Sequence, residues 1–550
     1  MTHSVAEWRL LCRLMLAFEG DRLPRWVARQ LRDAPAAGIT VFRHHNVRSP
    51  GQVRELTEAL QRAGAANAGG GAGGAGTAPL LVAADQEGGQ LQALGDAPTQ
   101  FAGNMALGAV GDEGLAERVG AAIGLESRAM GINVVYAPAV DLASEPANAG
   151  LGVRSFGDDP AAVGRLGAAM VRGLQGVGVA ATIKHFPGLG QTGTDTHHGL
   201  GVVELDRAEL EATAIAAFRA AIGSGPRLVM STHVAVPSLT GDRALPATLS
   251  PAVMRELLRD ELGFGGVTIS DALDMRALAQ GHAQAVEIIA VVRAGVDLLL
   301  CSADRRAQRR IEQALVAAAS RGLFDEGDLA ASSARIAALR SWLASVGPAP
   351  DLSVVGCADH RALSRELAER SVTLVRGPGG AGDAGQLLPA HATILAIMPQ
   401  PTDLTPADTS STVPPGLGRA LRTRFDSVEE VVVGVAPTVG EIAALRARAA
   451  GLDAVVVGTI DAIRQPAQFD LVDAVASAGR PTIAVALRTP WDVARYPASA
   501  AAVCTYSILP DSLEALAAGL AGAIPFAGRL PVVVPGVASP AAPAAPASPA

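Results

Sequence analysis

The sequence predicts an α/β protein with two domains, an N-terminal (β/α)8 barrel of the TIM type and a C-terminal α/β/α sandwich with a doubly wound sheet. Three observations predict it. The 550 residues are too many for one ordinary domain. From about residue 38 to 301, short apolar runs rich in β-branched residues alternate with stretches of helical period. After a Pro/Gly break at 346–353, a second series of the same kind begins.

The first domain is expected over residues 1–345. Residues 1–20 read as an amphipathic first helix, because charged residues such as Arg9 and Arg13 interrupt the apolar stretch and no cleavage site follows. The predicted strands are continuous apolar runs, at 38–43, 79–85, 132–141, 179–185, 227–233, 266–271 and 296–301. A barrel needs an eighth strand, which the pattern does not locate. The Gly/Ala run at 63–79 lacks the GK[ST] of a phosphate-binding loop and is expected to be a surface loop.

The second domain is expected over residues 354–536, after a linker at 346–353. Its predicted strands are again apolar and alternate with helices, at 371–377, 392–399, 429–436, 453–460, 481–488 and 501–507. The Ala/Pro segment at 537–550 cannot bury a core, so we expect a disordered tail.

Composition excludes several classes of partner. The net charge is -8 and there is no basic run, so neither nucleic acid nor an anionic membrane surface is indicated. Four separated cysteines predict neither a disulfide framework nor a zinc site. No uncharged apolar run reaches the ~20 residues that span a bilayer. We expect a cytoplasmic protein, a monomer or weak homo-oligomer, with a neutral or acidic small molecule as partner and no metal or organic cofactor.

Polar residues end most strands of the first domain. They are Asp85, Asp141, Lys184 with His185, His233 and Asp271. Because the carboxyl ends of barrel strands meet at one mouth, these side chains are expected to meet there.

The loop KHFPGLGQTGTDTHHGL at 184–200 carries the strongest chemical signal. Asp195 and His197 lie two residues apart, so the carboxylate can fix the tautomer of the imidazole and raise its basicity for proton transfer. An exposed histidine beside a turn aspartate is the simpler interpretation of this pair. The simpler interpretation of Asp271 is a helix N-cap. Cleavage of a glycosidic bond with retention, however, needs a carboxylate opposite a proton donor, about 5 Å away in the two-carboxylate case, and Asp271 could supply that carboxylate.

Two further segments carry side chains that could bind a sugar. In DQEGG at 85–89, Asp85 can hold paired hydroxyl groups, although turn capping is the alternative. In VRSFGDDP at 153–160, Arg154 can contact substrate or pair with Asp158.

Taken together, these segments resemble glycoside hydrolase family 3, and specifically its bacterial β-N-acetylglucosaminidase (β-hexosaminidase) branch. The matching segments occur in order: LMLAFEG, GITVFRHHN, DQEGG, APAVDL, RSFGDDP, KHFPGLGQTGTDTH, MSTHV, PATLSP, LGFGGVTISDALDM and AGVDLLL. The second domain is similar to the family's carboxyl-terminal sandwich through ALRTPWDVARYP, CTYS and PFAGRLPV.

The resemblance implies roles for eight residues. Asp271 would be the nucleophile, and His197 with Asp195 the acid/base dyad, because this branch takes its acid/base from a histidine on that loop. The residues implied in the sugar subsite are Asp85, Arg154, Lys184, His185 and His233.

Four positions depart from the family pattern. Leu189 replaces a histidine, for which we expect a packing change, and Ala272 replaces an acid. Gln90 and Ala93 stand where many members carry arginines that help to hold substrate, which leaves the aglycone and the exact sugar open.

The predicted function is a retaining exo-β-N-acetylglucosaminidase acting on muropeptides from peptidoglycan recycling or on chitin oligosaccharides. The alternatives are a phosphorylase or β-glucosidase on the same fold and, more distantly, a non-catalytic glycan-binding protein. Catalysis by the substrate's own acetamide would need an Asp-Glu pair at a strand end. The pairs present, at 112/113, 260/261 and 325/326, lie in helical or loop contexts.

Overall fold

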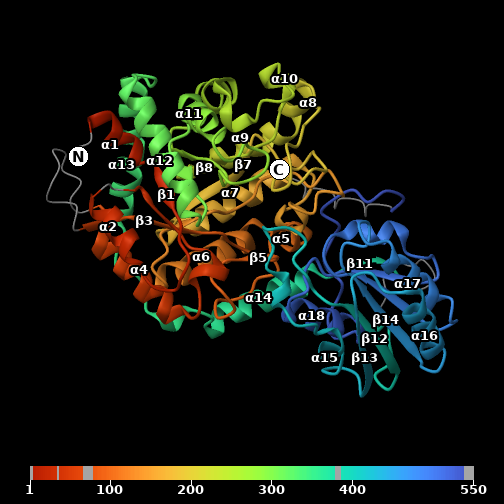
Figure 1. Ribbon diagram of the computed structural model, residues 1–550. Helices are drawn as coiled ribbons and strands as arrows, with labels where there is room; N and C mark the ends of the chain where they lie inside the picture. Colours follow the sequence, from red (N-terminus) through yellow and green to blue (C-terminus); the bar gives the residue numbers. More distant parts are fainter. Residues whose placement is uncertain (1–3, 34–35, 66–77, 378–385, 538–550) are drawn as a thin grey trace, which may run out of the picture. The chain divides into compact units, whose positions relative to one another are not determined.

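The computed structural model describes residues 4–33, 36–65, 78–377 and 386–537. The core of the predicted Gly/Ala loop, 66–77, and the tail from 538 onward lie outside the described residues. The chain folds as two compact units (Figure 1). One ends at Leu367 and also takes in Thr402–Thr412; the other comprises Ala368–Pro401 and the residues from Val413 onward. Among the described residues, no helix is both long and apolar enough to cross a membrane.

The first unit is the predicted barrel. Its eight parallel strands are ordered β10-β1-β2-β3-β6-β7-β8-β9, and an isolated parallel bridge between Ile269 and Leu298 joins the two ends of the sheet. The strands are β1 (Leu14–Leu16), β2 (Gly38–Thr40), β3 (Leu81–Ala84), β6 (Val134–Val135), β7 (Ala180–Phe186), β8 (Leu228–Ser231), β9 (Val267–Ile269) and β10 (Leu299–Leu300). A separate two-stranded ribbon pairs β4 (Gln86–Gly88) with β5 (Leu91–Gln92).

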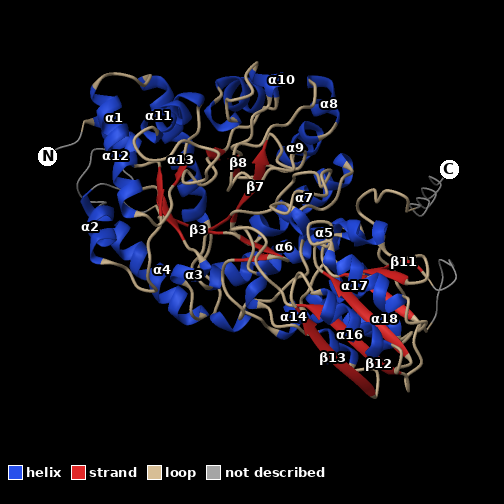
Figure 2. Ribbon diagram, turned by 45° about the vertical axis from the view of Figure 1, so that its right-hand side comes forward, coloured by secondary structure: helices blue, strands red, loops and turns tan. Residues whose placement is uncertain are grey.

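Helices surround these strands (Figure 2). They are α1 (Val5–Leu11), α2 (Arg25–Asp33), α3 (Arg43–Asn46), α4 (Pro50–Ala65), α5 (Asn104–Val110), α6 (Glu113–Ala129), α7 (Pro160–Gly176), α8 (Arg207–Ala212), α9 (Ala214–Ile222), α10 (Pro237–Thr240), η3 (Ala252–Glu261), α11 (Gln284–Ala294), α12 (Arg305–Ser320), α13 (Glu326–Ser345) and α14 (Ala358–Ser371).

The strand that the sequence pattern did not locate is β1, and the prediction of one helix over residues 1–20 is wrong. The helix α1 ends at Leu11, and Leu14–Leu16 then pairs with both β10 and β2. Three buried residues are too few for an apolar period to distinguish strand from helix.

The N-terminal ends of the barrel strands are covered by α13. Its side chains Ile336, Leu339 and Leu343 belong to the same buried cluster as residues of the barrel strands such as Leu81 and Val267. This packing leaves the opposite mouth, at the carboxyl ends of the strands, for a functional site.

The second unit contains a six-stranded sheet ordered β11-β16-β15-β14-β12-β13, in which only β11 is antiparallel. The strands are β11 (Thr373–Arg376), β12 (Thr393–Pro399), β13 (Ser427–Val433), β14 (Ala454–Thr459), β15 (Thr482–Ala486) and β16 (Ala501–Cys504). The strand order reverses at β12, so the doubly wound sheet is confirmed, with an added antiparallel edge.

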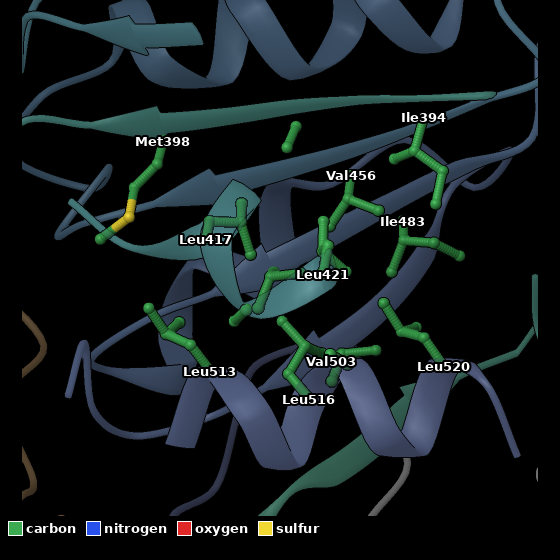
Figure 3. Packing of buried hydrophobic residues seen from close by; sticks show 14 of the residues in the cluster. Ile394, Met398, Leu417, Leu421, Val456, Ile483, Val503, Leu513, Leu516 and Leu520 are labelled. Atoms are coloured by element: carbon green, nitrogen blue, oxygen red, sulfur yellow. The ribbon is translucent and has the colours of Figure 1, made fainter. Parts of the chain in front are cut away.

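Alternation along the strands divides this sheet into two buried faces. One face packs Ile394 and Val456 against leucines such as Leu417 of α15 (Leu417–Leu421) and Leu516 of α18 (Pro510–Leu520) (Figure 3). The intervening strand residues face α16 (Val439–Ala449) and α17 (Ala467–Ala476), which pack on each other.

The division between the units differs from the linker placed at 346–353. That stretch leads into a short 3-10 turn at Leu352–Val354, and the first unit continues into α14. The sequence pattern also gives no sign that Thr402–Thr412 folds with the barrel.

Candidate active site

The carboxyl ends of the barrel strands surround a cavity of about 160 Å³. Seven of the eight residues singled out in the sequence line it: Asp85, Arg154, Lys184, His185, Asp195, His197 and Asp271. Further parts of the wall come from Phe42, Arg43 and His44 after β2 and from Pro406–Thr409 of the returning segment. Asp271 and the Asp195–His197 pair therefore line a common space.

Asp271 follows β9 and is held by the backbone. Its N–H donates to the carbonyl of Ser231 (3.2 Å), and one carboxylate oxygen accepts from the N–H of Ala272 (2.8 Å). Burial alone raises the pKa of this carboxyl group, but the nearby imidazoles of His185, His233 and His197 outweigh it and hold the pKa below its ordinary value. Asp271 is accordingly an anion at neutral pH.

Asp195 and His197 form a hydrogen-bonded dyad. Nδ1 of His197 lies 2.7 Å from Oδ1 of Asp195, and the same oxygen accepts the backbone N–H of His197 (2.9 Å). Burial lowers the pKa of His197, but the bond to Asp195 and the charge of Asp271 more than compensate, so the pKa lies above its ordinary value. With Nδ1 bound to the carboxylate, Nε2 is the nitrogen that can exchange a proton.

The loop that carries the dyad is fastened at both ends. A Cβ on Gly190 would lie 1.6 Å from the carbonyl oxygen of Leu142, so this close approach requires glycine. Further along, the carbonyl of Thr196 accepts the N–H of Ala277 (3.3 Å), from the segment that follows Asp271. The loop and the nucleophile candidate are thus connected through backbone contacts.

A buried charge network lies beside the dyad. The ammonium of Lys184 contacts Asp85 (2.6 Å) and Glu87 (2.5 Å), and Glu87 also accepts two hydrogen bonds from Arg154 (2.8 and 2.9 Å). Burial raises the pKa of Glu87, but these two cations outweigh it and lower the pKa to about 2. Two cations and two anions balance here, as buried charges require.

His185 is oriented by a second carboxylate. Its Nδ1 lies 2.6 Å from Asp141, which leaves Nε2 to accept from Arg154 at 3.2 Å. Asp141 also accepts the backbone N–H groups of His185 (3.0 Å) and Leu189 (2.7 Å). One carboxylate therefore fixes both the imidazole and the start of the dyad loop.

His233 does not line the cavity, unlike the other seven residues. It is fully buried, with its ring nitrogens near Thr248 (3.0 Å) and the carbonyl of Ala272 (3.2 Å). Burial lowers its pKa. His233 therefore contacts the peptide after Asp271 from outside the cavity.

The sequence pattern assigns no specific role to two residues that hold this site together. Glu87 lies within the DQEGG motif, and Asp141 is one of several polar residues at strand ends. The sequence signal for Asp141 is its position at a strand end. The sequence holds no such signal for Glu87, because its pairing with Arg154 and Lys184 joins three segments far apart in the chain.

Three of the four departures from the family pattern, Leu189, Ala272 and Ala93, line this cavity, and Gln90 contacts Thr409 in its wall. Leu189 lines it, and its carbonyl accepts from Asn148 (3.0 Å). The carbonyl of Gln90 accepts both the N–H (2.7 Å) and the hydroxyl (3.0 Å) of Thr409. Ala93 lines the cavity together with Pro406 and Ala407. Gln90 and Ala93 thus both lie beside the returning segment.

Among the described residues, no cluster of three or more His, Cys, Asp or Glu could hold a metal ion.

Comparison with known proteins identifies the family. The model "Glycosyl hydrolase family 3 N terminal domain" matches residues 16–339, more than half of the chain. The chain belongs to glycosyl hydrolase family 3. The family expected from the sequence motifs is confirmed.

Named relatives of this family 3 chain agree with the expected branch. It is 36% identical over 365 residues to Beta-hexosaminidase A of Pseudoalteromonas piscicida, covering 62% of this chain and 60% of the relative. It is 33% identical over 318 residues to the Beta-N-acetylglucosaminidase/beta-glucosidase of Cellulomonas fimi, covering 55% and 56%. The chain thus spans about three fifths of the length of these curated relatives.

A solved structure matches almost the whole family 3 chain. The glycoside hydrolase family 3 beta-N-acetylglucosaminidase from Paenibacillus sp. str. FPU-7 is 34% identical, with a TM-score of 0.89, covering 97% of this chain and 99% of that one. Both units of the fold are therefore shared with that enzyme.

Proposed function

We propose that this chain is a retaining exo-β-N-acetylglucosaminidase that removes terminal β-linked N-acetylglucosamine through a covalent glycosyl-enzyme. The observation that carries the proposal is the presence of the Asp195–His197 dyad and the Asp271 carboxylate in one cavity. The activities named for two similar proteins, beta-hexosaminidase and beta-N-acetylglucosaminidase, support the same substrate class.

In the first step, Asp271 attacks the anomeric carbon while His197, as imidazolium, protonates the glycosidic oxygen. The carbon–oxygen bond to the aglycone breaks as the bond to the Asp271 carboxylate forms. The charges favour these roles, because Asp271 stays ionised and His197 holds its proton to a higher pH than an ordinary histidine.

In the second step, neutral His197 removes a proton from water, whose oxygen attacks the anomeric carbon and displaces Asp271. Two inversions return the sugar to the β configuration. Asp195 stabilises the imidazolium that the first step consumes and the second step regenerates, by the hydrogen bond to Nδ1.

Asp85, Lys184 and Arg154 are proposed to bind the hydroxyl groups of the sugar. Each lines the cavity and belongs to the charge network described above, so each is held in one orientation before substrate arrives. His185 extends this surface, while His233 acts from behind Asp271. This differs from the expectation that all five residues contact the sugar.

The aglycone side is proposed to accept a neutral sugar. Leu91, Ala93, Pro406 and Ala407 present apolar groups there, and Arg43 is already paired with Asp96 (2.7 Å). This favours chitin oligosaccharides over anionic muropeptides as substrates. The cytoplasmic location expected from the sequence stays a prediction.

The test compares products from chitobiose and from an N-acetylglucosaminyl-anhydromuropeptide, with and without phosphate, by proton NMR. We expect β-N-acetylglucosamine as the first product, no dependence on phosphate, and faster turnover of chitobiose. Initial release of the α anomer would contradict retention, and formation of N-acetylglucosamine 1-phosphate would establish the phosphorylase alternative. Absence of turnover on either substrate would leave the β-glucosidase and glycan-binding alternatives.

A further inference from the structure

A second charged cavity, of about 330 Å³, lies at the other end of the barrel strands. Arg13 immediately precedes β1, and Asp297 lies two residues before β10, so these residues mark the amino ends of the strands, opposite the catalytic cavity. Its charged lining consists of five arginines and three aspartates: Arg13, Arg255, Arg259, Arg293, Arg335, Asp297, Asp325 and Asp328.

The charged side chains that line this cavity carry a net positive charge. Asp297 is shared by Arg259 (2.8 Å) and Arg335 (2.7 Å), and Asp328 pairs with Arg255 (2.6 Å). Five guanidinium groups therefore face three carboxylates, an excess of two positive charges. Neither Arg13 nor Arg293 has a carboxylate within ion-pair distance among the residues that the structure describes.

Arg13 is the least satisfied of these arginines. Only 2% of its surface is exposed, and one long hydrogen bond joins its Nη1 to the carbonyl of Val296 (3.4 Å). Burial lowers its pKa to about 10, so it still carries charge at neutral pH. A buried cation without a paired anion is strongly destabilising.

Three buried donors at this cavity also lack an acceptor within the described parts of the chain. They are Nε of Arg13, Nε of Arg259 and the hydroxyl of Ser332. They lie on three separate elements, the approach to β1, the helix η3 and the helix α13. Buried donors are usually satisfied, so three unsatisfied donors beside one charged cavity mark a region whose polar groups are not balanced within the chain.

We propose that this cavity binds a phosphate group, either free or as a monoester. Phosphate carries close to two negative charges at neutral pH, which matches the two excess positive charges, and guanidinium groups suit its oxygens. Apolar side chains of Val292, Phe324 and Leu329 line the same cavity and leave a place for the organic part of a small monoester. A carboxylate would neutralise only one of the two charges.

The experiment is isothermal titration calorimetry on the full chain at constant ionic strength, with inorganic phosphate in one arm and glycerol 3-phosphate in the other. The variants are Arg13→Met and Arg293→Gln. Arg293 is exposed, so its replacement tests the charge without disturbing the core. Arg309→Gln is the matched control, since Arg309 is an exposed arginine of α12 that does not line this cavity.

We expect one saturable site per wild-type chain. Phosphate affinity should fall about tenfold or more in Arg13→Met, which removes a charged donor, severalfold in Arg293→Gln, and not at all in Arg309→Gln. Tighter binding of the monoester would identify an organic phosphate as the ligand; equal or weaker binding would identify free phosphate. Unfolding of Arg13→Met would leave the decision to Arg293→Gln. Absence of saturable binding, or equal affinity in Arg293→Gln and wild type, would overturn the proposal.

Discussion

At the residue scale, three histidines surround Asp271 but only one is suited to move a proton. His185 is tied to Asp141, and burial lowers the pKa of His233. His197 alone combines a raised pKa with an imidazole that lines the cavity and rests on its own carboxylate. The chemistry is therefore set by the partners of each ring rather than by the number of histidines.

The first prediction concerns the Asp195→Asn variant. Because Asp195 raises the pKa of His197, its loss should move the basic limb of the kcat/KM pH profile to lower pH, where the imidazolium now loses its proton. We also expect kcat to fall about 10²- to 10⁴-fold, the usual range for losing acid–base catalysis. Asp206→Asn, at the exposed N-cap of α8, is the control and should leave the profile unchanged. An unshifted basic limb in Asp195→Asn would refute the dyad.

The second prediction concerns Glu87→Gln. The change leaves Lys184 and Arg154 with an uncompensated buried charge, so the free energy of unfolding should fall by about 3–5 kcal/mol in urea titrations. The matched control is Glu117→Gln, because Glu117 forms a half-exposed pair with Arg172 (2.9 Å) and should contribute at most about 1 kcal/mol.

The pH dependence of the Glu87 effect has a definite sign. Its folded pKa, about 2, is lower than the ordinary 4.5, so the stabilisation is complete above about pH 4.5 and is lost as pH falls toward 2. The stability difference between wild type and Glu87→Gln should therefore shrink over that range. A difference independent of pH would contradict an ionised Glu87.

At the element scale, two connecting segments build the site on a rigid barrel. The loop after β7 brings the dyad, and its path depends on the contact of Gly190 with Leu142. Thr402–Thr412 returns to the barrel unit and meets Gln90 through Thr409. Functional residues thus occupy loops that the strand ends hold in place.

The third prediction compares two glycines of the dyad loop. Gly190→Ala places a Cβ against the carbonyl of Leu142 and must displace the loop, so kcat/KM should fall at least tenfold. Gly199→Ala is the matched control, because an added Cβ there meets nothing within 4 Å. Equal activity of the two variants would show that the loop path is not fixed at Gly190.

The fourth prediction concerns Thr409→Val, which keeps the shape of the side chain and removes its hydroxyl. The hydroxyl bonds Gln90 (3.0 Å), and it accepts from the N–H of Gln92 (3.3 Å). KM for chitobiose should rise up to about tenfold, with little change in kcat. The same variant should hydrolyse a small aryl N-acetylglucosaminide almost normally. A fall in kcat on both substrates would instead place this segment in the chemical step.

At the scale of the whole molecule, the fold class and the meeting of seven of the eight singled-out residues in one cavity could be predicted from strand ends and motif order, since parallel strands deliver their ends to one mouth. Other features left no local pattern. The strand β1 has only three residues, and the meeting of Thr409 with Gln90 joins positions more than 300 residues apart. The burial of His233 depends on Thr248, which no periodicity marks.

The most direct test of the account is to trap the glycosyl-enzyme with a 5-fluoro-N-acetylglucosaminyl fluoride and locate the label by peptide mass spectrometry. We expect one sugar bound per chain, on the peptide that contains Asp271, and no label in Asp271→Ala. A label on a different carboxylate, or turnover in Asp271→Ala comparable to wild type, would contradict the assignment of Asp271 as nucleophile.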